Sequence, residues 1–293
     1  MTSILTNTSA MSALQTLRSI NMDLSNTQDR VSSGFRVGQA KDNVAYWSIS
    51  TTMNSDNKAL NAASDALGVG AAKVDTAYAA MESAISAVDE IKAKLVTASE
   101  QSTDKAQIQL EIGKLQEQLS AIAQGASFSG ENWMVLGNAT QASVVDGFIR
   151  TSSGGVSVTT AKFNIASNAM FATITAAGVG QGGILGSIMS VQLTSVSTQG
   201  AIDTFMDTVE LALSKLTDSA AAIGALQTRI DLQDAYSAKL SDAMEAGVSR
   251  LVDADMEEES AKLSALQTQQ QLAIQSLSIA NSSAKNIMSL FQQ

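Results

Sequence analysis

SDNKALNAASDALGVGAAKVDTAYAAMESAISAVDEIKAKLVTA, residues 55–98, carries apolar side chains at alternating steps of three and four residues. This spacing is the heptad pattern of a helix that packs along one seam, and at ~1.5 Å per residue the helix would be roughly 65 Å long. Gly70 is the weak member of the seam because glycine has no side chain to pack. The pattern predicts a long bundle helix with the seam positions Leu60, Ala63, Leu67, Gly70, Val74, Ala77, Met81, Ala84, Val88, Ile91 and Leu95.

The same periodicity returns in two further segments. After the polar break SEQSTD (residues 99–104), Asp104 followed by Gln107 predicts a new helix start, and the pattern continues to residue 124. A third frame covers residues 202–251 in the C-terminal half. We therefore expect a mainly α fold, a long coiled-coil helical bundle. The apolar members of the third frame are Ile202, Phe205, Val209, Ala212, Leu216, Ile223, Leu226, Ile230, Leu240, Met244 and Leu251.

Both ends of the chain carry narrower apolar stripes. Asn21 and Gln28 interrupt the N-terminal stripe, and Gln270 interrupts the C-terminal one. Stripes of matching width favour pairing of the two terminal helices with each other. A rod of two helices is too thin to bury its apolar faces alone, so such a pair needs neighbours.

The charges of the two ends support this pairing. Residues 1–41 hold four basic and two acidic residues, a net charge of +2, whereas residues 253–293 have a net charge of −3. The acidic run lacks the D-x-[DN]-x-[DN]-G pattern of a calcium loop, and it suits the positive end of a helix dipole. We expect charge pairing of Arg18, Arg30 and Arg36 with Asp253, Asp255, Glu257, Glu258 and Glu259.

The middle of the chain has a different composition. Residues 125–200 hold twelve of the nineteen glycines and four charged residues. Short β-prone runs occur between glycine-bearing turns: WMVL (133–136), SVVDGFI (143–149), VSVTT (156–160) and ATIT (172–175). This arrangement predicts a small β-rich insert between two helical arms.

The overall composition excludes several classes of site. The 293 residues include no histidine, cysteine or proline, so zinc, haem and iron–sulfur ligand sets, Ser-His-Asp triads, cysteine nucleophiles and disulfides are excluded. Oxygen-only cation sites and carboxylate acid–base chemistry stay open. A net charge of −10 disfavours nucleic-acid binding. We expect no cofactor and no metal site.

Two patterns in the middle segment admit a functional interpretation that we do not favour. Gly178, Gly180 and Gly183 spell G-x-G-x-x-G, but the residues that follow lack helical periodicity, so we expect a glycine-rich loop. Residues 163–202 contain no charged residue, yet only about half of them are apolar. A membrane-spanning helix needs about 20 predominantly apolar residues, so we expect no membrane insertion. The N-terminus has neither a basic region nor an apolar run, so we expect no cleavable secretory signal.

Four motifs resemble those of one protein family in the same order along the chain. VSSGFRVGQAKDNVAYWSIS (31–50) resembles the bacterial flagellin signature L-S-S-G-x-R-I-N-x-A-K-D-D-A-A-G-x-x-I, and FSGEN (128–132) is similar to the family's F-N-G turn. VDADMEEES (252–260) resembles D-A-D-x-A-x-E, and NIMSLFQQ (286–293) resembles N-x-L-S-L-L. The sequence FSGENWM (128–134) looks most like that of flagellins of alphaproteobacteria. The resemblance covers both helical arms of the chain.

The resemblance implies a structural subunit of the bacterial flagellar filament, exported by a flagellar type III apparatus and located outside the cell. Its partners would be further copies of the chain, other flagellins, a cap, junction proteins and an export chaperone, with no nucleic acid and no membrane. The subunit-interface stripe would then comprise Leu14, Leu17, Leu24, Val31, Leu263, Leu266, Leu277, Ile287 and Phe291.

The expected organisation has three parts. Residues 1–41 with 251–293 form a paired terminal coiled-coil domain, residues 42–135 with 200–250 a helical bundle, and residues 136–199 the β-rich surface insert. Two other functions stay open: a hook–filament junction protein, which would share the terminal arms, and a type III secreted membrane-active translocator, which the uncharged stretch suggests. An enzyme is disfavoured because no convergent set of catalytic residues is present.

Overall fold

A computed structural model describes residues 6–137, 139–151 and 155–290, with side chains described as far as residue 282 of the last helix. The chain forms two compact units, one of residues 1–57 with 242–293 and the other of residues 58–241. Two long helices, α2 (Val44–Ala98) and α5 (Gln199–Val252), contribute to both units. The division expected from the sequence into three parts, with boundaries near residues 41, 135, 200 and 251, stays a prediction.

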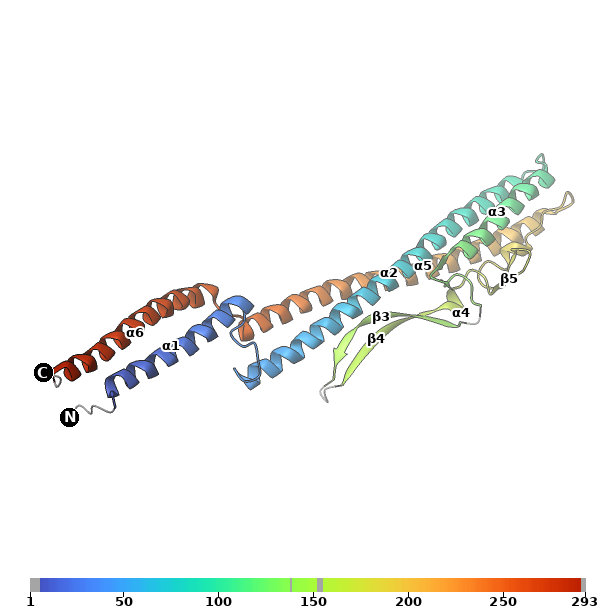
Figure 1. The fold of residues 1–293 in the computed structure, drawn as a ribbon. Helices are drawn as coiled ribbons and strands as arrows, with labels where there is room; N and C mark the ends of the chain where they lie inside the picture. Colours follow the sequence, from blue (N-terminus) through green and yellow to red (C-terminus); the bar gives the residue numbers. More distant parts are fainter. Residues whose placement is uncertain (1–5, 138, 152–154, 291–293) are drawn as a thin grey trace. The chain divides into compact units, whose positions relative to one another are not determined.

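In the second unit, α2 packs against α5 and against α3 (Lys105–Gly125), as Figure 1 shows. The contacts between α2 and α5 run in opposite directions along the two helices. Ser64 donates to Asp234 (2.9 Å), Gln227 donates to Asp75 (2.7 Å), and Lys92 forms an ion pair with Glu210. The two helices are therefore antiparallel, and the mainly α, coiled-coil bundle expected from the sequence is confirmed.

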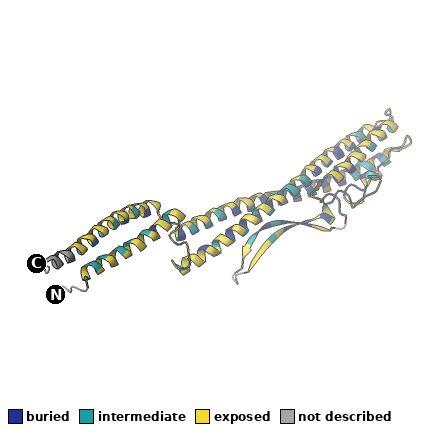
Figure 2. Cartoon of the chain, viewed as in Figure 1, coloured by how far each residue is buried: buried dark blue, intermediate teal, exposed yellow. Residues whose placement is uncertain are grey.

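The seam of residues 55–98 is confirmed at every position, because all eleven seam residues from Leu60 to Leu95 are buried. From Leu67 onward, the seam residues other than Gly70 meet Ile112 and Leu119 of α3 and Val209, Leu216 and further apolar residues of α5 in one hydrophobic cluster. Figure 2 shows buried residues recurring along the helices of this unit. Burial of apolar surface along this seam is what holds the bundle together.

The predicted restart of the helix after the polar break is also confirmed. α2 ends at Ala98, and α3 begins at Lys105 behind Asp104 in an extended conformation. The Asp104 carboxylate accepts hydrogen bonds from the backbone N–H groups of Ala106 (3.0 Å) and Gln107 (3.4 Å), which have no acceptor within the helix.

The segment between α3 and α5 holds the strands. Its main element is an antiparallel hairpin of β3 (Gln141–Arg150) and β4 (Val156–Asn164), where the sequence predicts SVVDGFI and VSVTT as strands. The pairs β1–β2 (Ser127–Phe128, Glu131–Asn132) and β5–β6 (Thr173–Ile174, Gly180–Gln181) are short, and a helical turn α4 (Ile165–Asn168) and a 3-10 turn η1 (Ile188–Ser190) complete the segment. The expected small β-rich region is therefore present.

Two of the four β-prone runs do not form the strands that the sequence predicts. WMVL contains only an isolated bridge between Val135 and Phe171, and in ATIT only two residues pair. Trp133 is buried and stacks on Phe163 with ring centroids 5.5 Å apart. The apolar character of WMVL reflects burial of side chains in the core, which β propensity does not distinguish from strand formation.

The β3–β4 hairpin is fastened to the helices at two points. Val144 is buried against α2 at Gly70, where a Cβ added to the glycine would lie 1.9 Å from Val144 Cγ1. A bulge between Val145 and Gly147 turns Asp146 toward α5, where Arg229 Nε donates to its carboxylate at 3.1 Å. This hydrogen bond and the attraction of Asp146 raise the pKa of Arg229. The missing side chain of Gly70 thus leaves the space that Val144 of the hairpin occupies.

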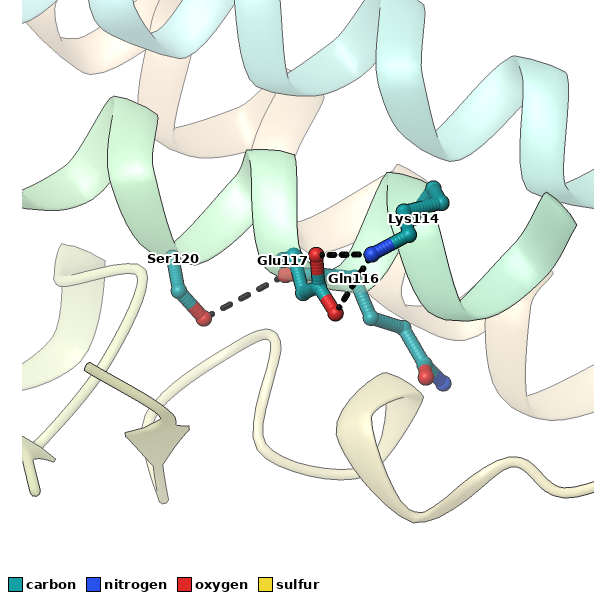
Figure 3. A network of polar contacts seen from close by, with 4 residues as sticks. All are labelled: Lys114, Gln116, Glu117 and Ser120. Carbon is teal, nitrogen blue, oxygen red and sulfur yellow. Dashed lines mark hydrogen bonds and ion pairs between the residues drawn. The ribbon is translucent and has the colours of Figure 1, made fainter. Parts of the chain in front are cut away.

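A buried amide fastens the end of the same segment to α3. The Gln116 side chain points away from the exposed Lys114–Glu117 ion pair, and its Nε2 donates to the carbonyls of Ile188 (2.8 Å) and Val191 (3.0 Å) (Figure 3). One turn further on, the Ser120 hydroxyl donates to the Gln116 carbonyl and accepts from the backbone N–H of Gly180. Polar side chains on the inner face of α3 therefore satisfy backbone groups of an irregular segment.

We expect Gln116→Leu to lower the free energy of unfolding by about 1–2 kcal/mol, because two carbonyl groups lose their donor in a buried place. Urea unfolding followed by circular dichroism measures this loss. The matched control is Gln118→Leu, two residues along the same helix at an exposed position, which should change stability by less than about 0.5 kcal/mol. Equal effects of the two substitutions would contradict this role for Gln116.

Candidate assembly surface

The two terminal helices of the first unit, α1 (Thr8–Ser33) and α6 (Met256–Leu290), lie side by side (Figure 1). Three polar contacts join them along their length. Asn7 Nδ2 donates to the Ala280 carbonyl (3.0 Å), Gln270 Nε2 donates to Asn21 Oδ1 (2.7 Å), and Arg30 pairs with Glu259 (3.0 Å). The contacts run in opposite directions along the two helices, so α1 and α6 form an antiparallel pair.

Local capping sets where these helices begin and end. The Asn7 side-chain oxygen accepts from the N–H of Ala10 at the start of α1, and Gly34, with φ of 77°, ends the helix by donating to the Arg30 carbonyl. This left-handed conformation favours glycine. At the start of α6, Asp255 accepts from the N–H groups of Glu257 (3.0 Å) and Glu258 (3.3 Å). α1 therefore ends at Gly34 and α6 begins behind Asp255, and the Ala254 N–H donates to the Gly34 carbonyl where these two ends meet.

A short backbone ladder closes this end of the pair. Phe35 and Asp253 form an antiparallel bridge, the N–H of Arg36 donates to the Val252 carbonyl (2.7 Å), and the N–H of Ala254 donates to the Gly34 carbonyl (2.9 Å). The chain that follows α1 is thereby joined to the chain that precedes α6. The contact between the terminal helices therefore extends into the segments that connect them to the rest of the chain.

The stripe expected at the subunit interface lies largely between α1 and α6 and stays partly open. Leu266 is 8% exposed, Leu14 is 37% exposed, and Leu17, Leu24, Val31, Leu263 and Leu277 are half-buried. Ile287 belongs to α6, but its side chain is not among those described, and Phe291 lies outside the described residues. The pair therefore covers its stripe incompletely.

The terminal pair buries far less than the bundle does. Among the described side chains, α1 has one buried residue, Thr27, and α6 has two, Glu259 and Leu266, whereas the shorter α3 has six. Figure 2 shows α1 and α6 mainly in the colours of exposed and intermediate residues. A groove of about 700 Å³ runs along the pair and is lined by Thr8, Ser9, Ser12, Ala13, Thr16, Ile20, Gln269, Leu272, Ala273 and Ser276.

The expected charge pairing between the termini is present at one position. Arg30 contacts Glu259, whose carboxylate is nearly buried. Arg36 Nη2 instead donates to the Leu251 carbonyl (3.1 Å), and Arg18 is exposed on α1. Asp253 and Asp255 belong to the connection and the cap described above, and Glu257 and Glu258 lie exposed in the first turn of α6, at the positive end of its dipole.

A second apolar surface of the first unit was not singled out from the sequence. At the start of α2, Val44 is 70% exposed and Ile49 is 48% exposed, and the aromatic rings of Tyr46 and Trp47 are also accessible. The sequence signal for this surface is a group of four large apolar residues within six consecutive positions that belong to no heptad frame. Exposed apolar clusters of this kind are typical of interaction sites.

The alternative sites considered from the sequence are not supported by the geometry. Gly178 and Gly183 have φ of +78° and +67° and flank β6 in a loop, and Gly180 packs against the ring of Phe171, so these glycines serve turns and close packing. In the ranges that the structure describes, no group of three or more acidic side chains is arranged to hold a metal ion. No described helix combines the length and apolarity needed to cross a membrane.

The turn FSGEN, which carried part of the resemblance, is tied to α2. Glu131 accepts a hydrogen bond from the Lys73 ammonium at 2.8 Å. This hydrogen bond lowers the pKa of Glu131, burial partly opposes it, and the positive charge of Lys73 adds to the lowering. Gly130 has φ of 85°, which requires glycine, so the motif has a structural explanation as a tight turn between β1 and β2.

Comparison with known proteins agrees with this arrangement. Residues 4–139 match the bacterial flagellin N-terminal helical region, and residues 206–291 match the bacterial flagellin C-terminal helical region. The chain is 46% identical to Flagellin C and 43% identical to Flagellin A of Rhizobium meliloti (strain 1021), and 45% identical to a flagellin of Brucella melitensis biotype 1, in each case over 100% of both chains. The chain therefore belongs to the bacterial flagellin family.

Proposed function

We propose that this chain is a structural subunit that self-assembles into the bacterial flagellar filament used for motility. The observation that carries the proposal is the incompletely covered apolar stripe of the α1–α6 pair, in a chain whose two arms both match flagellin helical regions. Head-to-tail contacts that do not close into a ring produce an open helical assembly. The terminal stripe is the surface that neighbouring copies would cover.

Burial of this stripe supplies the driving force for assembly. Covering one Leu, Ile or Phe side chain completely stabilises by about 1.5–3 kcal/mol. Ordering a terminal helix costs conformational entropy, and a two-helix rod recovers little of it alone, since few of its side chains are buried. The tails of a dilute monomer are therefore largely disordered in this proposal, and they become helical when copies add to the filament.

The remaining parts of the chain take different places in the proposed filament. Residues 1–41 with 251–293 line its core, residues 42–135 with 200–250 form an outer bundle, and residues 136–199 face the solvent. The exposed apolar start of α2, around Trp47, is a further candidate contact between copies. The role is structural and non-enzymatic, without nucleic-acid or membrane binding.

The proposed location is outside the cell, after export by the flagellar type III apparatus. The partners are further copies of the chain, other flagellins, the flagellar cap, junction proteins and an export chaperone. The family supports self-assembly directly, and these additional partners follow from the role of a filament subunit.

Polymerisation of the purified chain tests this proposal. We expect salt or filament seeds to produce long tubes, seen by negative-stain electron microscopy, and the helical circular dichroism signal to rise as tubes form. The physical reason is that the tails gain helix only when neighbours cover their stripes. Short aggregates or rings would contradict a filament subunit, and tubes that form without any gain in helix would contradict folding of the tails on assembly.

A further inference from the structure

The outward side of α1 carries two exposed methionines. Met11 is 64% exposed and Met22 is 63% exposed. Eleven residues separate them, which is close to three helical turns, so the two side chains lie on the same side of α1, roughly 16.5 Å apart along its axis. We call Met11 and Met22 the methionine ridge. Unbranched methionine side chains adapt to irregular gaps, which makes them common on binding surfaces.

The α1–α6 pair also contains a hollow of matching length. Its groove of about 700 Å³ is walled on the α1 side by residues from Thr8 to Ile20, which span roughly 18 Å along the helix. Small side chains line the groove, among them Ser12, Ala13 and Ala273, so the two helices leave space that their own side chains do not fill. The groove therefore has the length and the room for the side chains of the methionine ridge.

The polar residues of the two surfaces correspond as well. Gln15 and Arg18 lie between Met11 and Met22 on the exposed side of α1. The groove offers serine and threonine hydroxyl groups and the Gln269 amide, which can accept hydrogen bonds from both side chains. The ridge, apolar at its ends and polar between them, thus faces a groove whose walls are partly apolar and partly polar.

The ridge and the groove lie on different sides of one helix pair. Met11 is two residues from Ala13 and nine from Ile20, so it projects from about the opposite side of α1 to these groove residues. One copy therefore cannot place its ridge in its own groove. A contact between the ridge of one copy and the groove of the next is heterologous and leaves a ridge and a groove free at the two ends, which permits open growth.

We propose that, in the filament, the methionine ridge of one copy fills the α1–α6 groove of the next copy. The proposal rests on the filament function above, and it names the two surfaces through which one terminal pair contacts another. A second copy is the partner that the structure favours, because every copy carries one ridge and one groove of similar length. A helix from another protein would fill the groove and leave the ridge uncovered.

Cysteine cross-linking in mixed tubes tests this contact, since the chain has no cysteine of its own. Chains with Met22→Cys are mixed with chains that carry one exposed groove substitution, Ser12→Cys, Thr16→Cys or Ser276→Cys. The matched control partner carries Gln267→Cys, at an exposed position nine residues from Ser276 and therefore on about the opposite side of α6. After oxidation, denaturing gels show the covalent dimers.

We expect at least one groove position to give about tenfold more dimer with Met22→Cys than the Gln267→Cys control gives, because a disulfide requires Cβ atoms within about 4.5 Å of each other. Tubes made of Met22→Cys chains alone should give little dimer, since ridge does not meet ridge. Equal dimer formation with Gln267→Cys or in tubes of Met22→Cys chains alone, or no dimer at any groove position, would overturn the proposal.

Partial oxidation of the native chain is a second test that needs no substitution. Hydrogen peroxide transfers one oxygen to the methionine sulfur and leaves as water, and the product is a polar sulfoxide. Covering a sulfoxide removes its hydration, so chains oxidised at Met11 or Met22 should be about fivefold depleted in tubes relative to the unassembled fraction, measured by peptide mass spectrometry. Met256, which is 43% exposed in the first turn of α6 and belongs to neither surface, is the internal control. Equal depletion at Met256, or none at the ridge, would contradict the proposal.

The outcomes separate the contact from the function. Native tubes without sulfoxide depletion at the ridge, together with mixed tubes without cross-links, overturn the contact alone and leave the filament function intact. If Met22→Cys prevents tube growth, the peroxide experiment on the native chain decides. If the native chain forms no tubes, the filament function fails and the contact fails with it.

Discussion

Removal of residues 1–41 and 251–293 together is expected to abolish filament growth entirely. These segments contain α1 and all of α6, which carry the incompletely covered stripe. Without them, the surface whose burial drives association in the proposed filament is gone. Negative-stain microscopy after salt-induced or seeded polymerisation measures the effect.

The truncated chain is expected to stay folded in its bundle. The large hydrophobic cluster is made of residues between Leu67 and Ile230, all within the second unit. Thermal unfolding by circular dichroism should therefore remain cooperative, which shows that lost growth is not lost folding. Long tubes from the truncated chain would refute the proposed function.

A single substitution tests whether filament growth needs the apolar stripe itself or only the presence of the terminal segments. Leu24→Asp puts a charge into the half-buried stripe of α1, whereas Ser25→Asp puts the same charge on the neighbouring exposed position. Burial of an unpaired carboxylate costs several kcal/mol, so Leu24→Asp should slow or stop growth and Ser25→Asp should not. Equal growth of the two variants would place the assembly contacts elsewhere.

The second large effect is expected inside the bundle, at Gly70. An added Cβ at Gly70 would lie 1.9 Å from Val144 Cγ1 and 3.2 Å from Val144 Cβ, so either the hairpin or α2 must shift. Such overpacking costs about 1–3 kcal/mol, more than the helix propensity that alanine gains over glycine. We therefore expect Gly70→Ala to lower the free energy of unfolding, measured in urea, by about 1–2 kcal/mol.

Gly68→Ala is the matched control for this prediction. Gly68 lies two residues away in the same helix, is exposed, and has nothing within 4 Å of an added Cβ. Alanine there should stabilise by up to about 1 kcal/mol through helix propensity alone. Stabilisation by Gly70→Ala to the same degree would show that Val144 does not pack closely against Gly70.

A double variant tests the contact itself. Val144→Ala removes the nearest atom, Cγ1, and leaves an approach of 3.2 Å that a small shift relieves. Gly70→Ala should therefore cost much less in the Val144→Ala background than in the native chain, and the difference is the coupling energy of the two positions. Independent effects would mean that the overlap is relieved in another way.

Sequence periodicity was sufficient for the helices because it is a local property. The seam of α2 is buried at all eleven expected positions, and Asp104 caps α3 as its place before an apolar run indicates. The same approach was wrong for WMVL, since a short apolar run looks alike whether it forms a strand or fills a core. It also missed the exposed start of α2, where Tyr46 and Trp47 lie outside any repeat.

What the sequence by itself determined is the set of helices, the polar breaks between them and the two narrow terminal stripes, because helix period and capping depend on neighbours within a few residues. The tertiary structure decided which distant residues meet. Gly70 receives Val144, Asp146 turns to Arg229, and Asn21 finds Gln270. These partners lie 74 to 249 positions apart, so only the path of the hairpin and the register of antiparallel helices bring them into contact.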